Sequence, residues 1–147
     1  MGRIVVGVDG SEHGVDALRF ALAEARAHGS TVEAVLAWTY PLMADAYGGT
    51  AMAGVNPEAL VEGAKQALEQ AIEAATDDPA ERGAVQRKVV EGGAGHALVE
   101  ASRGAQLLVV GSRGHGGFTG LLLGSVSSQC VHHAHCPVVV VRPEAAH

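Results

Sequence analysis

Five short apolar runs, separated by segments with helical spacing, limit what this chain can fold into. The runs cover residues 4–8, 32–38, 85–90, 107–110 and 138–141. They are short and mostly rich in valine, which is typical of strands buried on both faces of a parallel sheet. The run at 85–90 alternates with polar residues, which indicates one wetter face.

Four segments between these runs carry apolar residues at helical spacing. They cover residues 15–25, 60–75, 97–101 and 126–134. Gly29 is a stop signal for the first, Asn56-Pro57 a start signal for the second, and Ser125 a start signal for the last. Strict alternation of strand and helix predicts an α/β fold with a doubly wound parallel sheet. We expect strand order 3-2-1-4-5, helices on both faces, and one Rossmann- or flavodoxin-like domain over residues 1–147.

The segment from residue 40 to 55 has no strand or helix pattern. It contains three glycines and many small residues. We therefore expect an irregular surface loop or lid.

Charge and composition exclude several classes of partner. The formal net charge is -6, whereas nucleic-acid binding requires a basic face. No apolar run approaches the roughly 20 residues of a membrane-spanning helix. The sequence begins with a strand-like segment and no leader, and its two cysteines form no disulfide framework. We expect a reduced, cytoplasmic protein with neither nucleic acid nor membrane as its partner.

Unusual residues gather in two loops, those after the first and fourth strands. In an open α/β sheet, ligands bind beyond the carboxyl ends of the strands where the winding direction reverses. Glycines in these loops let the backbone approach an anion. Gly124-Ser125 begins a helix whose first N–H groups and dipole favour a phosphate, and Arg113 adds positive charge. The sequence predicts a phosphate site built mainly from backbone amides.

The glycine spacing distinguishes this site from the two commonest phosphate loops. A Walker A loop needs a lysine before the serine, and a dinucleotide loop needs GxGxxG after the first strand. The sequence instead has Gly111-x2-Gly114-x9-Gly124-Ser125, which matches the G-x2-G-x9-G-S/T pattern of ATP-binding universal stress proteins. The segments IVVGVDGS, LLVVGSRG and LLLGSVSSQCVHHAHCPVVVV are also similar to that family, so the resemblance covers nearly the whole chain.

The resemblance implies ATP as the ligand and assigns a role to each matching position. Asp9 is expected near the ribose and the phosphate-bound Mg²⁺, Gly7 beside the adenosine, and the main chain of Ala37 against the adenine. The residues expected to wrap the ribose and phosphates are Gly111, Ser112, Arg113, Gly114, His115, Gly116 and Gly117. Those expected to complete the phosphate site are Gly124, Ser125, Val126 and Ser127. Family members form homodimers by pairing their last strands, here Val138 to Val141.

Other interpretations of these residues remain open. Asp9 could cap the first helix, but Ser11 can serve as that cap and leave Asp9 for a ligand. The cluster of His132, His133, His135 and Cys136 lacks zinc-site spacing, which favours a plain helix end. Cys130 is expected in the core and Trp38 in the core or at a pocket edge.

Catalytic signals are weak in this sequence. There is no GxSxG nucleophile elbow and no base at readable spacing. The sequence therefore favours a nucleotide-binding stress-response module with a regulatory role over an efficient enzyme. The alternatives are a slow ATPase or phosphotransfer enzyme, a binder of cyclic AMP or AMP, and a structural dimer. Ala37 gives a smaller adenine wall than larger aliphatic residues would, which keeps the other adenylates open.

Overall fold

A five-stranded parallel sheet forms the centre of the molecule. The computed structural model describes residues 2–40, 42–44, 50–52, 56–113 and 123–143. The strand order is β5-β2-β1-β6-β7, and every neighbouring pair is parallel. The strands are β1 (Arg3–Gly7), β2 (Thr31–Trp38), β5 (Gln86–Glu91), β6 (Leu107–Gly111) and β7 (Val138–Val141). In order along the chain these are strands 3-2-1-4-5, so the predicted topology is confirmed.

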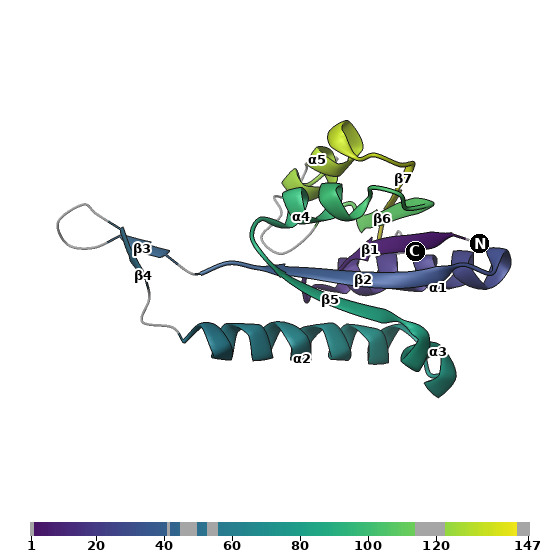
Figure 1. Ribbon diagram of the computed structural model, residues 1–147, viewed down its shortest axis with the longest axis horizontal. Coiled ribbons are helices and arrows are strands. Elements are labelled where there is room, and N and C mark those ends of the chain that lie inside the picture. The colour runs from purple at the N-terminus through teal and green to yellow at the C-terminus, as the bar shows by residue number, and fades with distance from the viewer. Residues whose placement is uncertain (1, 41, 45–49, 53–55, 114–122, 144–147) are drawn as a thin grey trace.

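Helices cover both faces of this sheet (Figure 1). One face carries α1 (Glu12–His28) and α2 (Pro57–Ala75), and the other carries α4 (Ala94–Ala101) and α5 (Ser125–His133). The predicted terminal signals hold: Gly29 ends α1 in the left-handed conformation at φ 65°. The Asn56 side chain caps α2 by accepting from the Glu58 amide, with proline in the first turn.

Two elements depart from the sequence-based expectation. Strands β3 (Leu42–Ala44) and β4 (Thr50–Met52) pair antiparallel, so the expected irregular structure is wrong for these residues. This small sheet lies apart from the main one in Figure 1. A short helix, α3 (Pro79–Ala84), was also missed; Asp78 caps it by accepting from the Ala80 amide. The expectation of a lid over the rest of segment 40–55 concerns residues 41, 45–49 and 53–55, which lie outside the described residues.

Two apolar clusters, one on each face, hold the helices to the sheet. Alternate residues of the strands point to opposite faces, so Ile4 and Val6 pack toward α1 and α2, while Val5 packs toward α4 and α5. Cys130 is fully buried in the second cluster, as predicted. Trp38 is half-buried at the margin of the first cluster. Among the described residues, no helix combines the length and apolar character needed to cross a membrane.

Candidate functional site

The first and fourth predicted strands, β1 and β6, are neighbours in the sheet. Ile4 pairs with Leu107 and Val6 with Val109, both in parallel register. The chain leaves β1 toward β2 on one side, whereas β6 flanks β1 on the other. The winding direction therefore reverses between these two strands, which is where open α/β sheets place their ligands. The loops after β1 and β6 consequently start at the same edge of the sheet.

The start of α1 packs closely against both loops. A Cβ added to Gly111 would lie 2.9 Å from His13 Cβ and 3.0 Å from the His13 carbonyl oxygen. A Cβ added to Gly14 would lie 3.3 Å from the backbone nitrogen and from Oδ1 of Asp9. These approaches bring the end of β6 and the Asp9 loop together through α1. Neither His13 nor Gly14 was predicted from the sequence. Gly14 could have been noticed, because a glycine in the first turn weakens a helix unless close packing requires it.

Asp9 is exposed and anchored by the residue two positions later. Its Oδ1 accepts from the Ser11 backbone amide at 2.9 Å and also from the Ser11 hydroxyl. Ser11 is the N-cap of α1, yet its side chain makes no capping hydrogen bond. Ser11 is thus the N-cap residue by position, as expected, but its hydroxyl bonds Asp9 instead of a helix amide. In an Asx turn, an Asp carboxylate accepts a hydrogen bond from the backbone amide two residues later. Such a turn accounts for this arrangement and holds the Asp9 side chain in place.

The carbonyl group of Ser112 joins the end of β6 to the start of α5. Its oxygen accepts from the Gly124 amide at 2.7 Å and from the Ser127 hydroxyl at 2.9 Å. The Ser112 amide in turn donates to the Val141 carbonyl at 2.9 Å. Ser112 and Ser127 are both buried. The Gly124 amide and the Ser127 hydroxyl, two expected phosphate donors, thus bond within the protein because a buried carbonyl needs a donor.

Further donors at this edge of the sheet are the first amides of α5. The first backbone bond of this helix runs from the Ser128 amide to the Gly124 carbonyl. The N–H groups of Ser125, Val126 and Ser127 therefore have no acceptor within the helix. Ser125 is exposed, so its hydroxyl faces solvent near these amides. These N–H groups and the positive end of the α5 dipole therefore face the same edge of the sheet.

The other predicted site residues divide into described and undescribed positions. Arg113 is half-buried directly after Ser112. Gly114, His115, Gly116 and Gly117 lie outside the described residues.

The two expected adenosine contacts lie near the same edge of the sheet. Gly7 ends β1 and pairs with Val35, and Ala37 lies two residues further along β2. A Cβ on Gly7 would lie 2.7 Å from Leu98 Cδ1, so close packing of α4 already explains this glycine. Ala37 is half-buried and pairs with Val90 of β5. The structure therefore places Gly7 at the end of the strand before the Asp9 loop, and Ala37 near the end of the neighbouring strand β2.

The histidine-rich end of α5 forms a separate feature. His132 Nδ1 lies 2.8 Å from the Ser128 carbonyl oxygen, and the rings of His132 and His133 are 6.3 Å apart. Within the described ranges, no group of three or more His, Cys, Asp or Glu residues is arranged to hold a metal ion. Burial raises the pKa of the nearby Cys130 thiol to about 11, so this cysteine stays protonated at neutral pH.

Known proteins are similar to this chain in sequence and in fold. Residues 1–142 match the model of the universal stress protein family. A universal stress protein of Mycolicibacterium smegmatis is 38% identical over 150 residues, which cover 98% of this chain and 50% of the relative. The chain thus spans about half the length of the curated relatives it matches.

Solved structures give the same picture of the fold. Universal stress protein UspA from Lactobacillus plantarum superposes with a TM-score of 0.74 at 21% identity, covering 96% of this chain and 97% of that one. A universal stress protein in complex with cAMP superposes with a TM-score of 0.60 at 26% identity, covering 97% and 98%.

Proposed function

This chain belongs to the universal stress protein family, and on that premise we propose that it binds ATP at the carboxyl ends of β1 and β6. The nucleotide would regulate partner contacts in a stress response rather than feed an efficient catalytic cycle. One observation carries the proposal: the Asp9 loop and the first turn of α5 follow two adjacent parallel strands at a point where the winding reverses.

Backbone amides fit a polyphosphate in a protein with this charge balance. The formal net charge is -6, so the whole protein does not attract an anion. The amides of Ser125, Val126 and Ser127 supply local positive potential, to which the dipole of α5 adds. The phosphates would therefore lie at the start of α5, and the ribose would lie toward Asp9.

Asp9 and Ser125 also suit a nucleotide-bound Mg²⁺ ion. A carboxylate and a hydroxyl are the oxygen ligands that Mg²⁺ prefers beside phosphate groups. When bound, the ion would screen the phosphates from the negative charge of Asp9. The Ser11 bonds to Asp9 Oδ1 would hold the carboxylate in position for this role.

Two substitutions at Ser125 separate the amide contribution from the hydroxyl contribution. Proline is tolerated at the first helical position, and Gly124 before it has φ -75° and ψ 172°, which a following proline accepts. Ser125→Pro therefore removes one amide and the hydroxyl while α5 persists, whereas Ser125→Ala removes the hydroxyl alone. Calorimetric titration with ATP and Mg²⁺ measures the affinity of each variant.

We expect Ser125→Pro to weaken ATP binding by about tenfold or more, since a hydrogen bond to a charged group is lost. Ser125→Ala should weaken it less. Asp9→Asn should weaken Mg²⁺-dependent binding of ATP. The control is Asp16→Asn, which removes a carboxylate from α1 and should leave this binding unchanged. No saturable ATP binding by the wild-type protein, or equal binding by wild type and Ser125→Pro, would refute the proposal.

A nucleoside monophosphate, AMP or cyclic AMP, is the second candidate ligand. The related structure at 26% identity is a complex with cAMP. The small Ala37 side chain would leave more room at the expected adenine position than a larger aliphatic side chain. Parallel titrations with AMP and cAMP decide between the candidates. Tighter binding of AMP or cAMP than of ATP would assign the site to a nucleoside monophosphate.

We also propose a homodimer that forms through β7. This strand is an outer edge of the sheet, and its four valines are half-exposed. An exposed apolar edge strand favours pairing with a second copy.

A further inference from the structure

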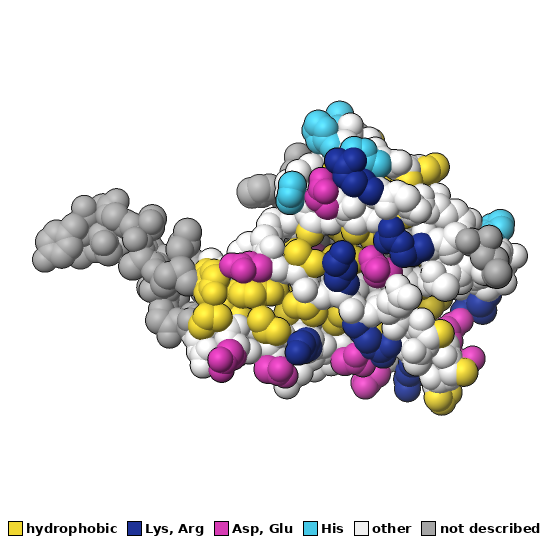
Figure 2. Space-filling view, viewed as in Figure 1, with side chains coloured by type: hydrophobic (Ala, Val, Ile, Leu, Met, Phe, Trp, Pro, Cys, Tyr) yellow, Lys and Arg dark blue, Asp and Glu magenta, His cyan; other side chains and the backbone are white. Residues whose placement is uncertain are grey.

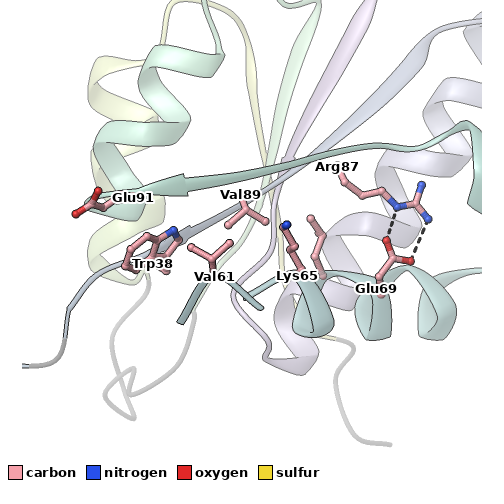
Figure 3. Close-up of a pocket in the computed structure, with 8 residues that line it drawn as sticks. Trp38, Val61, Lys65, Glu69, Arg87, Val89 and Glu91 are labelled. Atoms are coloured by element: carbon pink, nitrogen blue, oxygen red, sulfur yellow. Dashed lines mark hydrogen bonds and ion pairs between the residues drawn. The ribbon is translucent and has the colours of Figure 1, made fainter. Parts of the chain in front are cut away.

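A groove lies between α2 and the β5 edge of the sheet. Its volume is about 660 Å³, within the range of small-molecule sites. The lining residues are Trp38, Val61, Lys65, Leu68, Glu69, Arg87, Val89 and Glu91 (Figure 3). None of the described nucleotide-site residues is among them.

The sheet register explains why these strand residues share one face. Trp38 pairs with Glu91, and Leu36 pairs with Val89, so their side chains lie side by side toward α2. Ala37 precedes Trp38, and successive strand residues point to opposite faces. The groove therefore lies on the face opposite to the Ala37 side chain.

The groove floor is apolar and only partly covered. Val61 and Val89 are half-exposed, and they lie beside Trp38 in Figure 3. In the space-filling view, hydrophobic side chains gather on this part of the surface, with charged groups around them (Figure 2). A ligand with an apolar body would remove this surface from water.

Four charged side chains line the groove, namely Lys65, Glu69, Arg87 and Glu91. Arg87 holds Glu69 with two bonds, one of them at 3.2 Å, and these bonds lower the pKa of Glu69. Lys65 also lines the groove, where it points toward β5 (Figure 3), and its Nζ lies 3.7 Å from Glu62 Oε1. Glu91 has no ion pair and no side-chain hydrogen bond within the described part of the chain. The Trp38 end of the groove therefore carries a carboxylate without an ion pair in that part of the chain, while the whole lining balances two positive and two negative side chains.

We propose that this groove binds a small organic ammonium compound with an apolar body. The ammonium group lies against the Glu91 carboxylate and the Trp38 ring, which attract a cation by charge and by the ring quadrupole. The apolar body packs on Val61, Leu68 and Val89. The Arg87–Glu69 pair closes the other end of the groove (Figure 3).

Trp38 is the only tryptophan of the chain, so its fluorescence reports directly on the groove. The probe is 2-phenylethylamine, compared with neutral 2-phenylethanol and anionic 3-phenylpropionate, which have similar apolar bodies. We expect a saturable change in Trp38 emission with the amine, and weaker binding of the other two. Saturating ATP should leave the amine affinity unchanged.

Two variants test the charge assignment. Glu91→Gln should weaken amine binding about 3- to 10-fold, the range for one partly exposed charge contact with an aromatic ring. Lys65→Gln is the matched control, exposed on the facing helix, and should not weaken it. Unchanged binding in Glu91→Gln, or preference for the anion with loss in Lys65→Gln, would overturn the proposal.

Other occupants give distinct results. If the Trp38 emission changes with protein concentration and not with the amine, a second copy covers the groove and the proposal fails. Displacement of the amine by ATP would make the groove part of the nucleotide site and would equally overturn it.

Discussion

At the scale of single residues, the two site loops are organised by a few short-range hydrogen bonds. Ser11 holds Asp9, and the Ser112 carbonyl receives both the Gly124 amide and the Ser127 hydroxyl. These bonds leave the first amides of α5 and the Asp9 carboxylate at the edge of the sheet. The described ends of these loops are thus held by the protein itself, and such preorganisation reduces the entropy cost of binding.

The Ser127 hydroxyl should contribute to stability as well as to loop position. Ser127→Ala removes a buried hydrogen bond, so we expect the free energy of unfolding in urea to fall by about 1 kcal/mol. Ser128→Ala is the control, because no side-chain hydrogen bond of Ser128 is found among the described residues. Equal losses in the two variants would contradict the role of Ser127.

Cys130 should make the stability of the protein fall in alkaline solution. Burial raises the pKa of its thiol from 9.0 to about 11 in the folded state. The unfolded chain therefore loses this proton first, and between these values the free energy of unfolding falls as pH rises, by at most about 1.4 kcal/mol per pH unit. Below the lower pKa the thiol is protonated in both states, so it does not make the free energy of unfolding depend on pH.

The measurement is the difference between wild type and Cys130→Ala in unfolding free energy from about pH 8 to about pH 11. Other titrating groups, Cys136 included, are common to both proteins and cancel. We expect the wild-type advantage to shrink with rising pH. A constant difference would contradict the buried, neutral thiol.

At the scale of elements, terminal signals and periodicity account for most of the secondary structure. Gly29 and Asn56 mark the limits of α1 and α2 because each satisfies backbone groups at a helix end. The six residues of α3 include no buried position, so the sequence has no apolar stripe from which that helix could be predicted. The three-residue strands β3 and β4 are likewise too short for a recognisable alternation.

Two glycine substitutions distinguish a glycine required by conformation from one that is not. Gly29→Ala forces a Cβ into a left-handed cap at φ 65°, and we expect it to cost about 1 kcal/mol. Gly63 lies inside α2 with open space around it, so Gly63→Ala should stabilise by about 0.5–1 kcal/mol. Thermal unfolding of the two variants checks the opposite signs; shifts of the same sign would contradict the assigned conformations.

At the scale of the whole molecule, the strand order follows from connectivity rules that the sequence pattern reveals. Alternating strands and helices with right-handed crossovers leave few topologies, and valine-rich runs select the buried parallel strands. The sequence could not predict which donors remain for a ligand. A serine hydroxyl bonds a backbone carbonyl as readily as a phosphate, and Ser127 bonds Ser112 and Gly124. The groove beside Trp38 also depends on how α2 packs, which periodicity alone does not specify.

The proposed dimer predicts a defined effect at the β7 edge. Pro137 and Val141 direct their carbonyls toward β6, so by alternation Val138 and Val140 present their backbone groups at the outer edge. Val140→Pro removes an outward amide, and proline is tolerated on an edge strand. Sedimentation should show a dimer for wild type and a monomer for Val140→Pro. Equal assembly of both would reject pairing through β7.

The central claim is that an adenine nucleotide binds where β1 and β6 end side by side. The most direct measurement follows backbone amide resonances of the ¹⁵N-labelled protein during titration with ATP and Mg²⁺. We expect saturable shifts centred on Gly10, Ser11, Ser125 and Val126, with little change at Val61 and Val89. An absence of saturable shifts, or shifts confined to the groove between α2 and β5, would contradict the account.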